Sequence, residues 1–182
     1  MKTMKLAIMV AAMTMAMGWW VGEARGDGTS QKVEMGPVPR FTVQADTNCV
    51  VDNLTGLMWA RNANLPGATQ TWAQAVAFCK NLNYGGHSDW RLPNMMEFYS
   101  LMNTNYSKPR LSNTEGTAQW KEKDPFTGLQ IYGVYWMTTT TTGQPAGAWL
   151  ANIEGNISRE NNIETTGAGY VWPVREVKER QP

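Results

Sequence analysis

The sequence is poor in the residues on which metal and nucleophile chemistry depends. Its 182 residues include only two cysteines, Cys49 and Cys79, and one histidine, His87. A zinc site built from cysteine and histidine needs about four ligands, so the chain holds too few for one. No serine- or cysteine-centred nucleophile motif accompanies His87, which argues against covalent catalysis. We therefore expect no catalytic residues, no cofactor and a protein that is not an enzyme.

Clusters of one charge sign are also absent. The 16 basic and 15 acidic residues are interspersed along the chain, with no basic stripe. Nucleic acids and anionic membrane surfaces both require clustered lysine and arginine. Beyond the first 26 residues, no segment is apolar enough to span a membrane. We therefore expect no nucleic-acid partner and no membrane insertion of the mature protein.

The N-terminal segment has the layout of a secretory signal peptide. Two lysines precede an apolar or small run over residues 6–17, and small residues fit cleavage after Ala24 or Gly26. The alternative is an uncleaved anchor, because residues 6–22 form a stretch as long as 17 residues. A helix that spans a membrane needs about 20 apolar residues, however, so this stretch is short for an anchor. We favour cleavage of residues 1–26, which predicts export by the Sec route to the periplasm, the cell surface or the medium.

The chain after residue 26 divides into three parts. Residues 27–40 are typical of an N-terminal arm or linker, residues 41–176 form one domain, and residues 177–182 are a polar tail. Removing residues 1–26 leaves 13 basic and 14 acidic residues. An exported chain with an even number of cysteines favours a disulfide, here between Cys49 and Cys79. The alternative is two buried free thiols.

Short apolar runs predict strands on both sides of a helical region. Residues 40–45 alternate between apolar and polar, and "CVVDNLTGLMWAR" (49–61) has two β-type runs around a turn at Gly56, as in a hairpin. Pro173 lacks an N–H, so its strand is expected at a sheet edge or with a bulge. Further strand-like runs lie at 134–141, 148–153 and 169–176, with a tight turn at 154–156.

Two capping boxes predict two helices. Thr71 and Gln74 have the spacing of a capping box, and Asn94 and Glu97 repeat it. Strands, two helices, a long loop and further strands together make an α+β fold. The apolar positions expected to be buried are Trp72, Ala75, Val76, Cys79 and Leu82 in the first helix, and Met95, Phe98, Leu101 and Met102 in the second.

Two polar segments, residues 103–131 and 142–168, are the candidate binding surface, because long loops in compact domains are often functional. Trp120 lies in the first segment and would either contact a sugar or protein partner or pin the loop to the domain. "NIEGNISRENNIE" (152–164) offers oxygen ligands for Ca²⁺, and its alternative is a polar hairpin. The candidate ligand-binding residues are Trp120, Asn152, Glu154, Asn156, Arg159, Asn161 and Asn162.

Several segments together resemble one family, the Lcl C-terminal domain family, named after the Legionella collagen-like adhesin. They are "DNLTGLMWAR", "TWAQAVAFCKNLNYGGHSDWRLPNMMEFYSL", "YWMTTT", "AWLANI" and "YVWPVR", which occur in family order between residues 41 and 175. The resemblance implies a C-type-lectin-like fold, with two helices flanking a small, twisted, mainly antiparallel sheet and long irregular loops. The name-giving adhesin binds sulfated glycans. This activity is expected to carry over only weakly, because the chain has no collagen-like repeat.

The resemblance also bears on the cysteines and on "GGHSDWRLPN" (85–94). Many family members have a cysteine in the final strand that can pair with the one in the first helix, whereas this strand has Trp172 and no cysteine. The formylglycine-generating enzymes of the same fold rely on a late cysteine pair, which is also missing. In the family, residues 85–94 are a fold signature. We therefore favour a structural clamp over a His87–Asp89 catalytic pair, and the clamp residues are Asp89, Trp90, Arg91 and Pro93.

The residues and the resemblance together predict an exported, non-enzymatic recognition or adhesion module of the bacterial envelope or surface. Its partner would be a glycan or an envelope or surface protein, bound through the loops. The alternative is a structural subunit of a surface filament or envelope complex, in which the N-terminal arm packs on a neighbouring copy.

Overall fold

The computed structural model describes residues 21–24, 31–34, 38–141, 147–160 and 167–177. The chain divides into two compact units, Met1–Val38 and Pro39–Pro182. In the first unit, β1 (Val21–Ala24) pairs antiparallel with β2 (Gln31–Glu34). Most of the predicted signal peptide and of the polar tail lies outside the described residues. None of the helices in the described ranges has the length and hydropathy of a membrane span.

The second unit contains a four-stranded antiparallel sheet in the order β3-β4-β5-β9. As predicted, a turn joins β4 to β5, with Gly56 at a φ of 70°, a left-handed conformation that glycine adopts without strain. Pro173 immediately precedes β9, which is an edge strand, so the prediction for this proline is confirmed. The strands are β3 (Phe41–Val43), β4 (Cys49–Asp52), β5 (Leu57–Ala60) and β9 (Val174–Glu176).

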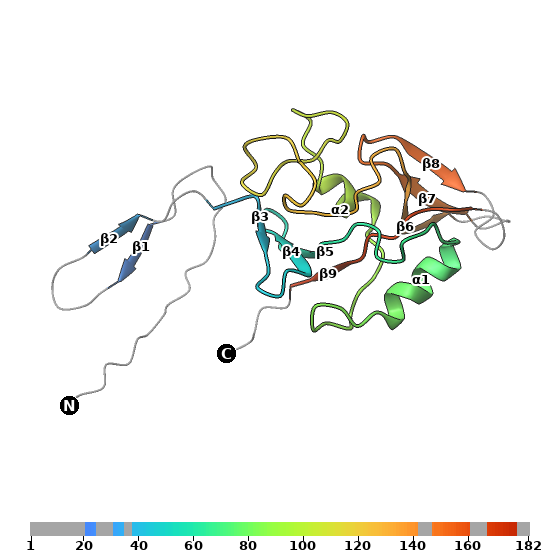
Figure 1. The fold of residues 1–182 in the computed structure, drawn as a ribbon, viewed down its shortest axis with the longest axis horizontal. Coiled ribbons are helices and arrows are strands. Elements are labelled where there is room, and N and C mark those ends of the chain that lie inside the picture. Colours follow the sequence, from blue (N-terminus) through green and yellow to red (C-terminus); the bar gives the residue numbers. More distant parts are fainter. Residues whose placement is uncertain (1–20, 25–30, 35–37, 142–146, 161–166, 178–182) are drawn as a thin grey trace. The chain divides into compact units, whose positions relative to one another are not determined.

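A three-stranded antiparallel sheet in the order β6-β7-β8 lies at the other end of this unit (Figure 1). The predicted turn between β7 and β8 is present, with Gly155 at a φ of 85°. The α+β class is therefore confirmed, but the described strands of the second unit form two sheets where the resemblance implied one. The strands are β6 (Tyr135–Thr141), β7 (Gly147–Ala151) and β8 (Ile157–Glu160).

Both helices begin at the predicted capping boxes. At the start of α1 (Trp72–Asn81), the backbone N–H of Gln74 donates to Thr71 Oγ1 (3.3 Å), and the backbone N–H of Thr71 donates to Gln74 Oε1 (2.9 Å). Asn94 and Glu97 make the same pair of bonds at the start of α2 (Met95–Ser100). Each cap satisfies backbone N–H groups that the helix leaves without a partner.

The buried stripe of α1 is narrower than predicted. Ala75 and Cys79 are buried, but Val76 is 36% exposed, so its assignment to the core is wrong. Phe78 packs partly against the core instead. The reason is that α1 packs against β6, and only the positions that face this strand lose their contact with water.

Trp172 joins the two sheets and α2 through an aromatic cluster. Its fully buried indole lies 5.5 Å from Trp59, 5.0 Å from Phe126 and 5.6 Å from Tyr135, measured between ring centroids. Phe98 of α2 completes the cluster at 6.3 Å. The indole N–H of Trp172 donates to the carbonyl oxygen of Ala60 in β5 (2.9 Å), so the buried polar atom has a partner.

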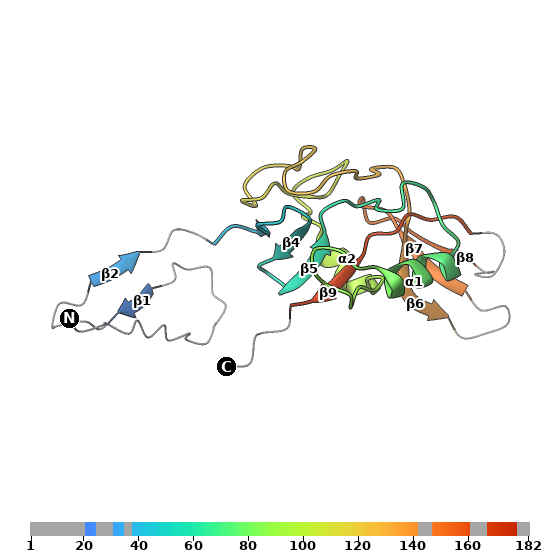
Figure 2. The same ribbon diagram turned by 60° about the horizontal axis from the view of Figure 1, so that its bottom comes forward.

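Residues 103–131 form irregular loops on one side of this unit, as both ribbon views show (Figure 1, Figure 2). They are not detached from the core, since Leu111, Phe126 and Leu129 are buried. The segment therefore has both a buried face and an exposed face.

The disulfide predicted between Cys49 and Cys79 is not formed. Both cysteines are free and buried. Cys49 of β4 belongs to the cluster around Trp59, whereas Cys79 of α1 packs in a second cluster with Leu92 and Trp136. Their positions in separate clusters favour the alternative of two buried thiols.

We expect both thiols to be unreactive in the folded protein. Burial, with a smaller contribution from Asp46, raises the pKa of the Cys49 thiol to about 11, and burial raises the pKa of the Cys79 thiol to about 12. A disulfide-exchange reagent at pH 8 should label neither cysteine in the native state and both after unfolding, because the thiolate is the reactive form. Rapid labelling of the native protein, or a mass two hydrogens lower, would contradict this assignment.

The same shifts predict that stability falls at high pH. In the unfolded chain the thiols lose their protons near pH 9, while in the folded chain they keep them up to about pH 11 and 12. The folded state then binds more protons, so the free energy of unfolding decreases as the pH rises above about 9.

Candidate functional site

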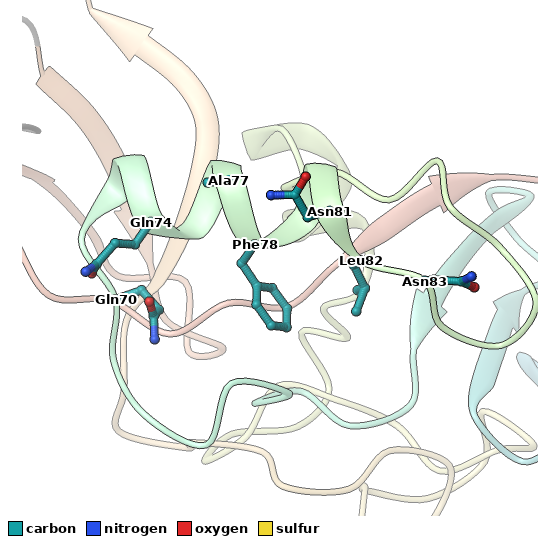
Figure 3. Close-up of a pocket in the computed structure, with 7 residues that line it drawn as sticks. All are labelled: Gln70, Gln74, Ala77, Phe78, Asn81, Leu82 and Asn83. Atoms are coloured by element: carbon teal, nitrogen blue, oxygen red, sulfur yellow. The ribbon is translucent and has the colours of Figure 1, made fainter.

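An open groove of about 400 Å³ runs along one side of α1 (Figure 3). Phe78 and Leu82 project from the same side of the helix, with Gln70 and Gln74 at one end of the groove and Asn83 at the other. From Gln74 to Leu82 the helix rises about 12 Å at 1.5 Å per residue. The lining residues are Gln70, Gln74, Ala77, Phe78, Asn81, Leu82 and Asn83.

At one end of the groove, hydrogen bonds to the backbone of Gln70 fix its position. The N–H of Gln70 donates to Gly169 O (2.9 Å), and its carbonyl oxygen accepts from the N–H of Gly169 (3.0 Å) and the indole of Trp136 (2.8 Å). These bonds use the backbone of Gln70, and its side-chain amide makes no hydrogen bond to the residues that the structure describes. The side-chain carbonyl oxygen of Gln74 accepts the hydrogen bond of the helix cap, so the NH₂ group of this side chain remains available as a donor.

The groove is electrically neutral. None of its seven lining residues is charged, and between Arg61 and Asp89 the sequence has one charged side chain, Lys80. The guanidinium group of Arg61 is occupied by carbonyl oxygens, with Nε donating to Pro125 O (2.9 Å). An apolar floor flanked by four side-chain amides can therefore bind uncharged hydroxyl and amide groups.

The predicted clamp residues contact different parts of the fold. Arg175 of β9 donates from Nε and Nη2 to the two carboxylate oxygens of Asp89 (2.6 and 3.2 Å). The ring of Trp90 is buried, and its indole N–H donates to the carbonyl oxygens of Tyr84 and His87 (both 3.1 Å). The carboxylate of Asp89 therefore pairs with an arginine, and His87 contributes its backbone carbonyl oxygen and an edge-to-face ring contact to Trp90.

Arg91 and Pro93 extend these contacts to α2 and β6. Arg91 forms a two-pronged ion pair with Glu97 of α2 (2.7 Å for each bond), while its backbone pairs with Val174 of β9. The hydrogen bond to Glu97 raises the pKa of the guanidinium group. Burial alone raises the pKa of Glu97, but the bonds from Arg91 and Asn94 outweigh it and lower that pKa. The carbonyl oxygen of Pro93 accepts from Thr138 (2.8 Å).

The predicted ligand residue Trp120 has a structural contact. Its side chain is half-buried against the core, and its indole N–H donates to the carbonyl oxygen of Phe126 (3.3 Å). This geometry favours the alternative in which Trp120 pins the long loop. An exposed aromatic ring directly after this loop is Tyr132, which is 82% exposed and lines a second hollow together with Tyr170 and the neighbouring residues 129–133.

The other predicted ligand residues follow β7. Asn152 organises the turn, since its side-chain oxygen accepts from the backbone N–H groups of Glu154 (3.1 Å) and Asn156 (2.9 Å). One carboxylate oxygen of Glu154 is buried without a hydrogen-bond partner in the described part of the chain. Arg159 is described by its backbone, which pairs with Trp149, while Asn161 and Asn162 lie outside the described residues.

The comparison with known families agrees with the resemblance seen in the sequence. The family model of the Lcl C-terminal domain matches residues 48–175. The chain belongs to the Lcl C-terminal domain family. The match includes the α1 groove, the clamp residues and all three strands of the β6-β7-β8 sheet, and it begins after β3. The comparisons with curated proteins and with solved structures found no match.

The Lcl C-terminal domain offers little support for a metal centre in its described part. No group of three His, Cys, Asp or Glu side chains in the described ranges could share a metal ion. Its α1 groove was missed in the sequence, because glutamine and asparagine on a helix are typical of a solvated surface. The available indication was the long stretch between Arg61 and Asp89, in which Lys80 is the one charged side chain.

Proposed function

We propose that this Lcl C-terminal domain is a non-enzymatic recognition module of the bacterial envelope or cell surface that binds a glycan through the α1 groove. The family supports a surface-associated, adhesin-like role. The observation that carries the proposal is the lining of the groove, in which Phe78 and Leu82 are flanked by side-chain amides. Protein sites for neutral polar ligands combine an apolar surface with a few hydrogen-bonding groups.

The arrangement of elements supports a C-type-lectin-like fold as part of this proposal. Two short helices, small antiparallel sheets and a long irregular segment, residues 103–131, are the features that such a fold requires. Export through the N-terminal segment would place the domain where extracellular or envelope glycans are available. Binding at the groove does not require the loop residues that the sequence indicated.

A glycan array probed with the exported protein tests the proposal. We expect retention of at least one glycan class and about tenfold weaker binding of Phe78→Ala. An aromatic contact contributes about 1 kcal/mol in addition to its buried apolar area, and a loss of about 1.4 kcal/mol weakens binding tenfold. Asn81→Ala is the second variant, since Asn81 is exposed and its loss should not disturb folding.

Val76→Ala is the matched control. Val76 is 36% exposed on the same helix and does not line the groove, so this variant should bind like the parent protein. Thermal melting of each variant separates loss of binding from loss of folding. Absence of any retained glycan would remove the proposal, and retention of an envelope protein instead would favour protein recognition.

A further inference from the structure

The charge and amide content of the α1 groove restrict the kind of glycan that it can take. Sulfated or carboxylated sugars require several lysine or arginine side chains to compensate their charge. The seven lining residues include no lysine or arginine. The one charged residue of α1 is Lys80, which does not line the groove. The segment that leads into α1, residues 61–71, has one basic side chain, Arg61. Its guanidinium group donates to backbone carbonyl oxygens, so it is not available to pair with an anionic sugar.

The side-chain amides of the groove indicate which uncharged group of a glycan it can bind. The side chains of Gln70, Asn81 and Asn83 make no hydrogen bond within the described part of the chain, so each offers one acceptor and an NH₂ donor. Phe78 and Leu82 offer an apolar surface between them (Figure 3). An acetamido group has the matching parts, namely an N–H donor, a carbonyl acceptor and a methyl group.

From this match we infer that the α1 groove takes an uncharged glycan bearing N-acetyl groups, and that sulfate and carboxylate groups play no part in its recognition. The inference rests on the proposed function. With about 12 Å between Gln74 and Leu82 along the helix, the groove accommodates a short oligosaccharide. The acetamido methyl group lies on Phe78 and Leu82, and its amide pairs with the side-chain amides at the groove rim.

Titration of the exported protein with three probes tests the inference. The probes are tri-N-acetylchitotriose, cellotriose, which has the same linkage without acetamido groups, and a heparin-derived oligosaccharide. We expect binding of the first, about tenfold weaker binding of cellotriose, and no binding of heparin. Raising NaCl from about 50 to about 500 mM should change the first affinity by less than about twofold, because no ion pair is screened.

Two substitutions locate the site. Asn83→Ala and Gln70→Ala should each weaken binding of tri-N-acetylchitotriose by about tenfold, without a change in melting temperature. Lys80→Ala, the control on the same helix, should leave the affinity within about twofold, because no charged group of the ligand is involved. A loss in Lys80→Ala as large as that in Asn83→Ala would overturn the inference.

The outcomes separate this inference from the proposed function. Salt-dependent binding of heparin, or equal binding of cellotriose and tri-N-acetylchitotriose, overturns the inference and leaves glycan recognition standing. Failure of all three probes, with no glycan retained on the array, overturns both. Binding of tri-N-acetylchitotriose that is unaffected by Asn83→Ala and Gln70→Ala places the sugar elsewhere and overturns the assignment to the α1 groove.

Discussion

Trp172→Ala should lower the free energy of unfolding by about 4 kcal/mol, the usual cost of deleting a buried tryptophan. Trp172 is fully buried among aromatic rings from β5, α2, β6 and the long loop. Its removal leaves a cavity where these elements meet and deprives Ala60 O of a hydrogen bond. For a chain of this size the melting temperature should fall by roughly 10 °C, measurable by calorimetry or urea titration.

Trp172→Phe provides the graded control for this prediction. It keeps an aromatic ring in the cluster and removes the indole N–H, so we expect a loss of about 1 to 2 kcal/mol. Trp120→Ala removes a half-buried ring and should cost less than Trp172→Ala. A melting temperature of Trp172→Ala within about 2 °C of the parent value would show that the cluster is not the centre of the core.

Features that depend on neighbouring residues could be predicted from the sequence. Both capping boxes use side chains three positions apart, and the β4–β5 turn needs little more than a glycine at position 56. The placement of Pro173 beside an edge strand followed from its missing N–H. Each of these signals acts within one turn of helix or one hairpin, so no knowledge of distant pairing was needed.

Features that depend on distant pairing were not predictable in this way. The division into two sheets is set by β9 returning to β5, and no local pattern encodes that choice. The same return places Trp172 in the main core cluster, and the packing of the chain puts Cys49 and Cys79 in different clusters. The cysteine count therefore favoured a disulfide that the packing does not form.

In the candidate site, too, the residue types could be predicted from the sequence, whereas their arrangement in space could not. The amides around α1 are visible in the sequence, but their grouping into a groove depends on where Gln70 is held by Gly169 and Trp136. Trp120 was singled out because it lies in a polar loop, yet its indole is turned to the core and bonded to Phe126 O. Burial of a loop side chain is a tertiary property, and the sequence left both alternatives for Trp120 open.

Asp52→Ala should lower the free energy of unfolding by about 3 kcal/mol, because it breaks a buried ion pair on one side. Asp52 is completely buried at the end of β4, where it accepts from Arg40 Nη2 (2.9 Å) and from the backbone N–H of Leu54 (2.9 Å). Arg40 also donates to the carbonyl oxygen of Ser100 at the end of α2 (2.7 Å). The substitution would leave a partly buried guanidinium group without its carboxylate.

The matched control is Asp46→Ala, which removes the same charge from an exposed turn and should cost less than about 1 kcal/mol. Equal urea midpoints for the two variants would mean that the Arg40–Asp52 pair does not stabilise the junction of β4 and α2.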